Sequence, residues 1–115
     1  MPGGISIHAV DVASGRPAHG LAVEVTATTG GRRIVASGTL NAHGGLDDPV
    51  TDGAGIEAGD YEVLFRIGDY LRRQGSEHVG FLEVIAFRFN ITRPEEHFHL
   101  PLKFTAWGYS IFRGS

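Results

Sequence analysis

Apolar and polar residues alternate along much of this chain, and this period of two limits what the chain can fold into. Apolar residues occupy every second position in residues 5–9, 21–25, 61–67 and 85–91. Because successive side chains of a strand point to opposite faces, this spacing predicts strands with one buried face. Glycine-rich segments such as 28–31 and 52–60 separate these runs, and the chain holds 17 glycines. The pattern predicts the short turns of an antiparallel two-sheet sandwich.

One segment departs from this alternation. In "GDYLRRQGSEH", Asp69 is a candidate N-cap, good helix formers follow it, and Gly75 is a stop signal. We therefore expect one short helix between two strands. "TRPEEH" reads as a turn, with Pro94 ending the preceding strand. No repeat or linker divides the chain, so we expect residues 1–115 to form one mainly-β domain.

Composition excludes several classes of function. The net charge of −3 provides no basic field for nucleic acid or an anionic membrane surface, so we expect neither as a partner. The chain has no cysteine, which excludes disulfides and thiolate chemistry. No apolar run approaches membrane-spanning length, and "MPGGISIHAV" lacks the features of a signal peptide. A cytoplasmic protein is the expectation.

Three histidines lie on the polar side of two predicted strands. His97 and His99 are two residues apart, so both project from one face, while Phe98 takes the opposite face. His8 projects away from the apolar side of its own strand. Spacing leaves three interpretations open: ordinary exposed histidines, a zinc or copper site, or general acid–base catalysis near neutral pH. The three side chains would converge if the two strands are neighbours.

Other candidate sites are weaker. Asp47 and Asp48 form a carboxylate pair, but the surrounding glycine and proline residues favour a turn. "GRRIV", residues 31–35, is a small basic cluster that is typical of a solvated strand edge. No nucleophile elbow, P-loop or dinucleotide fingerprint is present.

The last 19 residues, "HFHLPLKFTAWGYSIFRGS", are rich in aromatic side chains and poor in charge. Chain ends without a role are usually polar and frayed. We therefore expect this segment either to close the core or to line a site.

Four stretches resemble the 5-hydroxyisourate hydrolases, the transthyretin-like enzymes of urate breakdown in purine metabolism. They are "ISIHAVDVASGRPAHGLAVEV", "NAHGG", "GDYEVLFRIGDYLRRQG" and "EEHFHLPLKFTAWGYSIFRGS". The resemblance implies a transthyretin-like two-sheet sandwich of about eight strands with one short helix. It also implies a homotetramer of paired dimers, with active sites in the channel between dimers and the last strand lining that channel. No cofactor and no metal are implied.

The implied reaction is the hydrolytic opening of a cyclic ureide by a water that histidine activates. His8, His99 and Ser115 match the family's catalytic positions, and the order in which the two histidines act is left open. Arg113 would help Ser115 to bind or orient the substrate, and His97 would be a structural neighbour. Ile111, Phe112, His43 and Gly45 complete the expected substrate-binding set.

Two positions depart from the family pattern. The family motif N-A-D-G-R reads "NAHGG" here, so Gly45 stands where the resemblance implies an active-site arginine, and His43 replaces the aspartate. The terminal Y-R-G-S reads "FRGS", so Phe112 lacks a hydroxyl. A glycine cannot supply the charge or the bidentate geometry of arginine. We expect a hydrolase whose substrate has shifted toward a less polar ring, such as an N-methylated 5-hydroxyisourate.

Two other functions stay open on the same residues. A divergent member could perform different ring chemistry in a secondary pathway, such as lactam opening, isomerisation or cyclisation. A non-catalytic binding protein of the transthyretin type would also fit the loss of the arginine. The two histidines favour an enzyme.

Overall fold

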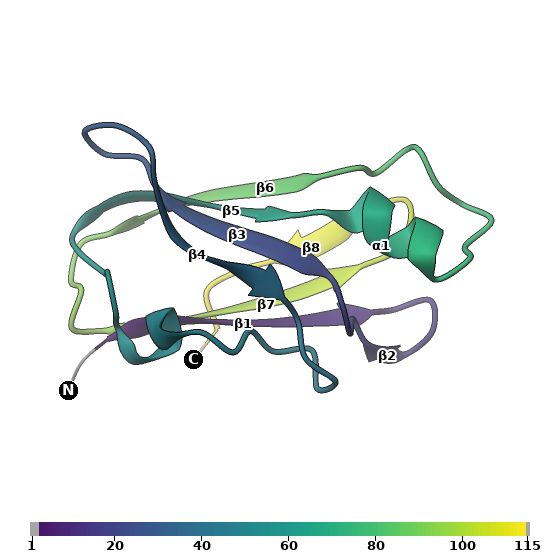
Figure 1. Cartoon of the computed structure of the whole chain (residues 1–115), viewed down its shortest axis with the longest axis horizontal. Helices are drawn as coiled ribbons and strands as arrows, with labels where there is room; N and C mark the ends of the chain where they lie inside the picture. Colours follow the sequence, from purple (N-terminus) through teal and green to yellow (C-terminus); the bar gives the residue numbers. More distant parts are fainter. Residues whose placement is uncertain (1–2, 115) are drawn as a thin grey trace.

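The computed structural model describes residues 3–114 as two packed β-sheets with one short α-helix at one end (Figure 1). The first sheet has the order β2-β1-β7-β8 and the second the order β4-β3-β5-β6. The first sheet contains β1 (Gly4–Asp11), β2 (Arg16–Pro17), β7 (His97–Phe104) and β8 (Tyr109–Ile111). The second contains β3 (Ala22–Ala27), β4 (Arg33–Thr39), β5 (Gly59–Phe65) and β6 (Ile85–Ile91). The predicted sandwich of about eight strands is therefore confirmed.

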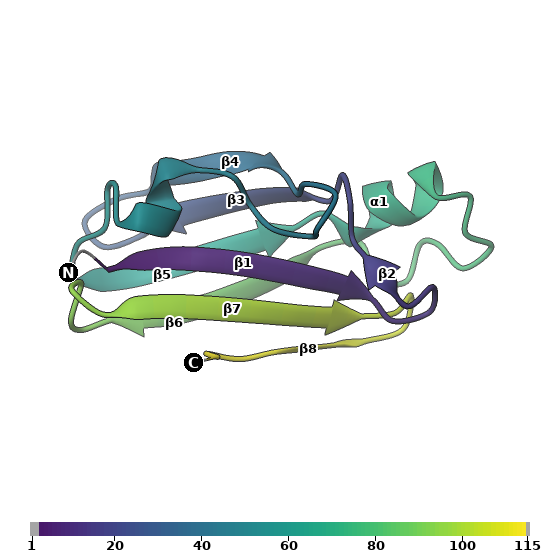
Figure 2. The ribbon, with the colours of Figure 1, turned by 90° about the horizontal axis from the view of Figure 1, so that it is seen from below.

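The strand pairing differs from the prediction at one place. Five pairs are antiparallel, but β1 and β7 run parallel, with Gly4 opposite His97 and Asp11 opposite Phe104. The turn after β6 brings the chain to the other sheet at the end where β1 begins, so both strands start from the same side (Figures 1 and 2). This pairing places the first and last long strands of the chain side by side.

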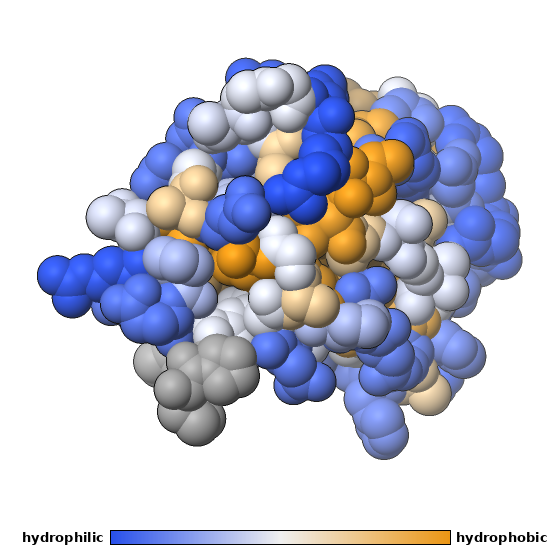
Figure 3. All heavy atoms as spheres, turned by 60° about the vertical axis from the view of Figure 1, so that its left-hand side comes forward, coloured by the Kyte–Doolittle hydropathy of each residue, from blue (hydrophilic) through white to orange (hydrophobic). Residues whose placement is uncertain are grey.

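The alternation in the sequence corresponds to the two faces of each strand. In β1, Ile5, Ile7 and Ala9 are at most 2% exposed, whereas Ser6 and His8 lie on the opposite, outward face. The largest fully buried side chains include Tyr61, Phe65 and Phe104, which fill the space between the sheets. Figure 3 shows hydrophobic residues in a band across one face, with hydrophilic residues around it.

The helix begins earlier than the sequence predicted. Helix α1 spans Ile67–Arg73, and its N-cap is Arg66, which makes no side-chain capping bond. The expectation that Asp69 caps the helix is therefore wrong: Asp69 lies within the first turn, where a carboxylate still favours the helix dipole. Buried Ile67, which the period of two assigned to β5, instead opens the helix. Gly75, with φ +73°, follows the helix end as predicted.

The carboxylate pair at residues 47–48 lies in a turn, as predicted. The side chain of Asp48 accepts a hydrogen bond of 2.8 Å from the backbone N–H of Val50 and caps a short 3₁₀ helix, η1 (Pro49–Asp52). Asp47 accepts a hydrogen bond from the side-chain amide of Asn41. Both carboxylates therefore stabilise the loop that leads from β4 to β5.

The aromatic side chains near the end of the chain divide into two groups. Phe98 and Phe104 on β7 are 6% and 1% exposed and close the core. Trp107, Tyr109 and Phe112, in the hairpin and strand that follow, are between 50% and 61% exposed. The segment therefore closes the core and also carries an aromatic surface. Among residues 3–114, no helix has the length and apolar character needed to cross a membrane.

Candidate active site

The three histidines that the sequence singled out lie on the outward face of the sheet β2-β1-β7-β8. Parallel pairing places Ser6 opposite His99 and His8 opposite Pro101, so His8 and His99 are diagonal neighbours on adjacent strands. The predictions that His97 and His99 share a face, and that His8 faces away from Ile5 and Ile7, agree with the burial pattern. Neighbouring strands thus supply the convergence that spacing alone left open (Figure 2).

Two irregular segments extend the sheet on either side of these histidines. Residues 41–46 run along the part of the β1 edge that β2 leaves unpaired. There the N–H of Ala9 donates to the Gly44 carbonyl at 3.0 Å, and His8 forms an isolated antiparallel β-bridge with Gly45. The tail after β8 runs along β7, where the N–H of Gly114 donates to the His99 carbonyl at 2.7 Å. The histidines therefore lie on two central strands, with the "NAHGG" loop on one side and residues 112–114 of the tail on the other.

The two glycines of the "NAHGG" loop have different structural requirements. Gly44 has φ +84°, and a Cβ there would lie 2.7 Å from the Ala9 carbonyl oxygen and 3.3 Å from Nε2 of His8. Gly45 has no positive φ. The atoms nearest to a Cβ there would be those of the Asn41 side chain, at 3.6 Å, and the Ile7 carbonyl oxygen, at 3.8 Å, which is ordinary contact. The backbone requires glycine at position 44 and accepts a side chain at position 45.

Asn41 organises this loop. Its side-chain oxygen accepts hydrogen bonds from the N–H groups of His43, at 2.8 Å, and Gly45, at 3.1 Å. An Asn side chain that bonds its own backbone two residues on is a standard way to fix a turn. Asn41 thereby holds the His43 carbonyl at 2.8 Å from Nε2 of His8.

That contact fixes the protonation of one ring nitrogen. A carbonyl oxygen can only accept, so Nε2 of His8 must carry the hydrogen and donate it to His43. Neutral His8 then has its lone pair on Nδ1. His43 contributes to the site through its backbone, while the residue as a whole is exposed.

Ser6 lies between the other two imidazoles. Its Oγ is 2.8 Å from Nε2 of His97 and 2.7 Å from Nδ1 of His99. Within residues 3–114, no carboxylate forms a hydrogen bond or ion pair with the side chains of His8, His97 or His99. Partial burial lowers the pKa of His99, and the positive charge that His8 and His97 can carry lowers it further. His99 is therefore neutral at neutral pH and able to accept a proton.

The structure does not bring every expected residue to this face. Ile111 pairs with inward-facing Leu102 and packs against the core, so it points away from the histidines. Alternation sends Arg113 the same way, where it donates to Glu96 at 3.1 Å and lies 4.2 Å over the Phe98 ring. Phe112, between them, points outward and is 51% exposed. Ser115 follows Gly114 and lies outside the described residues.

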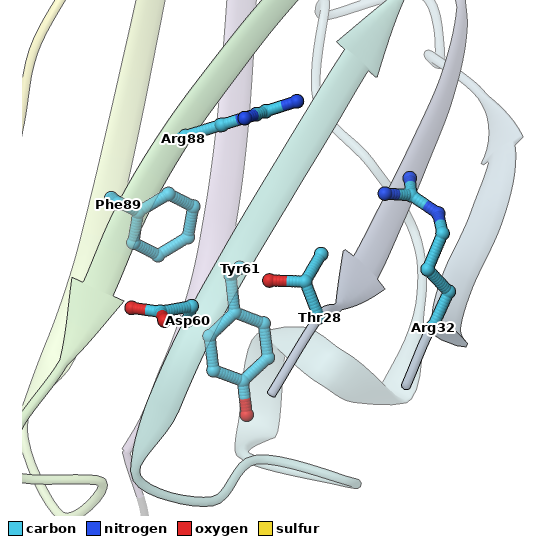
Figure 4. A pocket seen from close by; sticks show the side chains of 6 residues that line it. All are labelled: Thr28, Arg32, Asp60, Tyr61, Arg88 and Phe89. Atoms are coloured by element: carbon cyan, nitrogen blue, oxygen red, sulfur yellow. The ribbon is translucent and has the colours of Figure 1, made fainter. Parts of the chain in front are cut away.

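A second polar cluster lies on the outer face of the other sheet. Figure 4 shows Arg32 and Arg88 extending toward one another across β5, above a hollow that Thr28 and Asp60 also line. Both guanidinium groups donate to the carboxylate of Glu62 at 2.8 Å. These two hydrogen bonds hold the pKa of Glu62 below its ordinary value. Residues 3–114 hold no group of three or more His, Cys, Asp or Glu side chains arranged for a metal.

Sequence reasoning missed Ser6 and Asn41. Ser6 is two residues before His8, so the period of two already put both on one face. What the sequence did not reveal is that β7 pairs with β1 in the register that places Ser6 opposite His99. Asn41 begins the "NAHGG" motif and carried a recognisable turn signal.

Fold and site together define a transthyretin-type sandwich with a histidine-bearing outward face. A 5-hydroxyisourate hydrolase, named 5-hydroxyisourate hydrolase 2, of Rhizobium meliloti (strain 1021) is 39% identical over 116 residues, covering 98% of this chain and 97% of that protein. A solved structure of Klebsiella pneumoniae 5-hydroxyisourate hydrolase superposes with a TM-score of 0.82 at 29% identity, covering 98% and 99% of the two chains. Residues 5–114 match the model of the HIUase/Transthyretin family, and the chain belongs to that family.

One similar structure carries a different name. A crystal structure of (S)-allantoin synthase superposes with a TM-score of 0.90 at 29% identity. The match covers 99% of this chain but 44% of that longer one, so the likeness concerns one part of that protein. The shared fold therefore also occurs in a protein named for a different reaction.

Proposed function

We propose that this protein is a hydrolase that opens the ring of 5-hydroxyisourate or a modified analogue. The observation that carries the proposal is the pairing of His8 and His99 on one face, in a chain whose relatives of nearly equal length are named 5-hydroxyisourate hydrolases. Such a reaction needs a group that takes a proton from water near neutral pH and a group that protonates the leaving nitrogen. Imidazoles suit both tasks.

His99 is the general base in this proposal. Its lowered pKa keeps it neutral, and with Nδ1 bonded to Ser6 its other nitrogen, Nε2, is free to take a proton from water. The water attacks a ring carbonyl carbon, the C–N bond to the adjacent ring nitrogen breaks, and that nitrogen receives the proton. His8 accepts a hydrogen bond at Nδ1 and orients the reacting groups. Ser115, which the family resemblance assigns to the site, contacts the substrate in this proposal.

The substrate is less polar than the one the family pattern implies. Position 45 accepts a side chain, so glycine there is not a requirement of the backbone. A site without the arginine and without the hydroxyl at position 112 loses donors that would each contribute about 1–3 kcal/mol to binding a polar ring. An N-methylated ring, with fewer N–H groups and more bulk, suits such a site better. We assign this substrate class to the protein.

The site is completed by assembly in a homotetramer of paired dimers. Support comes from large aromatic side chains that are exposed in the last segment of the chain: Phe112, which points outward on the histidine face, and Trp107 and Tyr109 at the turn between β7 and β8. Large exposed apolar side chains gathered in one segment are a common feature of interfaces. Sedimentation velocity measures the assembly state directly, and a monomer at micromolar concentration would overturn this part of the proposal. A metabolite hydrolase of this kind would act in the cytoplasm.

The deciding experiment follows the decay of freshly generated 5-hydroxyisourate and of its trimethylated analogue by ultraviolet absorbance. We expect the protein to accelerate both decays, and the methylated compound by the larger factor. Equal and full activity on the unmethylated compound would contradict the substrate shift. No acceleration of either compound would contradict the hydrolase itself.

The likeness to (S)-allantoin synthase favours a second candidate, namely different chemistry on a related ring. Nuclear magnetic resonance of the product separates the two candidates, because hydrolysis adds water and opens the ring. Saturable binding without turnover would instead indicate a binding protein.

A further inference from the structure

One serine hydroxyl contacts two histidine rings on the same sheet face. Ser6 Oγ lies at hydrogen-bonding distance from Nε2 of His97 and from Nδ1 of His99, at 2.8 and 2.7 Å. A hydroxyl has a single hydrogen to donate and two lone pairs with which to accept. Ser6 can therefore donate to only one ring and must accept an N–H from the other.

This constraint links the tautomers of the two neutral imidazoles. When Ser6 donates to His97, Nδ1 of His99 carries a hydrogen and Nε2 of His99 has the lone pair of a base. When Ser6 donates to His99, Nε2 of His99 carries the hydrogen and can serve as an acid, while His97 donates to Ser6 through its Nε2. Hydrolysis requires His99 with a lone pair on Nε2, as a base, and His99 with a hydrogen on Nε2, as an acid. The orientation of the Ser6 hydroxyl determines which of these two forms is present.

We propose that Ser6 is a positioning residue that relays a proton between His99 and His97. After Nε2 of His99 takes a proton from water, Nδ1 of His99 passes its proton to Ser6 Oγ, and Ser6 passes its own hydrogen to Nε2 of His97. His99 is then neutral with its hydrogen on Nε2, and His97 is the imidazolium. The reverse transfer follows when His99 gives the Nε2 hydrogen to the leaving nitrogen, so no proton is gained or lost.

Burial favours this direction of transfer. His97 is exposed, whereas Ser6 and His99 are half-buried, so water hydrates a positive charge better on His97. Other groups surround the pair: His8 lies diagonally on β1, and Glu96 and Arg113 lie beside the His97 backbone, with Arg113 donating to the His97 carbonyl at 3.2 Å. The lowered pKa of His99 agrees with a charge that moves outward.

The tautomer linkage is testable without any substrate. In ¹⁵N-labelled protein, long-range ¹H–¹⁵N correlation spectra distinguish protonated from unprotonated ring nitrogens. We expect the neutral rings of His97 and His99 to carry their hydrogens on the same ring nitrogen, both on Nδ1 or both on Nε2. We also expect protonation of one ring to shift the resonances of the other. Ser6→Ala should uncouple the two titrations, and Ser6→Thr, which keeps the hydroxyl, should preserve them. Identical spectra and titrations of the two rings in wild type and Ser6→Ala would overturn the linkage.

The claim that Ser6 relays a proton during catalysis rests on the proposed hydrolase function, and enzyme kinetics test this claim separately. We expect Ser6→Ala to lower kcat by roughly 10- to 100-fold with little change in KM. Ser6→Thr should recover most of the rate. Ser37→Ala, an exposed serine on β4, is the matched control and should keep the wild-type rate.

A double-mutant cycle separates a relay from two independent contributions. If Ser6 acts through His97, the Ser6→Ala/His97→Ala variant should be no slower than the slower single variant. Rate losses that multiply would overturn the relay. Coupled titrations in a protein that hydrolyses neither ureide would uphold the linkage and reject only the proposed function.

Discussion

The outward faces of the two sheets both carry polar side chains gathered across neighbouring strands, and the two gatherings differ in how their charges are compensated. On the sheet β4-β3-β5-β6, Glu62 is 6% exposed and its two oxygens accept from Arg32 and Arg88. On the sheet β2-β1-β7-β8, the imidazoles of His97 and His99 share a single serine hydroxyl. One face holds a charged group with opposite charges around it, and the other holds neutral groups that can titrate.

Because of this difference, we expect the Glu62 cluster to stabilise the fold and the histidine face to take part in proton transfer. The two arginines hold the pKa of Glu62 low, so that carboxylate stays charged through the neutral range. It contributes stability above its ordinary pKa and loses it as the pH falls through its lowered value. The histidines have no such partners among residues 3–114, and imidazole is the side chain suited to proton exchange near neutral pH, so this face can take part in proton transfer.

Replacing His99 should have the largest effect in the molecule. His99→Ala removes the proposed base, and we expect the rate of ring opening to fall by about 10²–10⁴-fold. His19→Ala, an exposed histidine near α1, is the control and should keep the wild-type rate. Ultraviolet assays of both variants measure the ratio. Equal losses of rate in the two variants would show that His99 is not the base.

Adding an arginine at position 45 should change specificity. The backbone accepts a side chain there, so Gly45→Arg should fold and should shift the ratio of rates toward unmethylated 5-hydroxyisourate by about 10- to 100-fold, equivalent to about 1–3 kcal/mol. Gly45→Ala tests the added bulk without the charge. An unchanged ratio in Gly45→Arg would show that position 45 does not select the substrate.

Neutralising Glu62 should affect stability and leave catalysis alone. Glu62→Gln keeps the shape but loses the charge, and we expect the free energy of unfolding to fall by about 1–2 kcal/mol, limited because both arginines are largely exposed. Glu24→Gln, on the same sheet and without an ion pair among residues 3–114, should change it little. Urea titration and the ring-opening assay on each variant complete the comparison. A large loss of rate in Glu62→Gln would contradict the structural role assigned to this cluster.

The smallest effect should be in the pH dependence. Protonated His99 cannot act as a base, so activity falls when the pH drops through its pKa. Because that pKa is lowered, the acid limb of kcat/KM should lie below about 6.5, the ordinary value for histidine. The contribution of His99 to the free energy of unfolding changes in the same direction. Its imidazole binds a proton more tightly in the unfolded chain than in the folded one, so stability decreases as the pH falls below the ordinary pKa of histidine. An acid limb above that value would place the base elsewhere.

Local patterns predicted which way side chains point, and they failed where distant segments decide. The alternation around Ile5 and Phe98 identified the buried faces correctly, because facing depends only on the strand itself. It could not reveal that β1 and β7 are parallel neighbours, so Ser6 was missed. The resemblance placed Ile111 and Arg113 in the site as parts of one motif, although alternation turns both side chains away from the histidine face within one chain.

The helix start shows the same limit. Asp69 satisfied the local signal for an N-cap, but the N–H of Gly68 donates to the Glu83 carbonyl and the Ile67 side chain is buried. Tertiary contacts therefore begin the helix two residues before that signal.

The parallel pairing of β1 with β7 has a consequence for biosynthesis. Ser6 leaves the ribosome early, but its partners His97 and His99 follow some ninety residues later, near the end of translation. A chain interrupted before residue 97 would contain β1 through β6 and none of the histidine pairing. Long-range strand contacts of this kind form late, after the loops between them have closed. Any activity of this protein therefore reports that nearly the whole chain has been made and has folded.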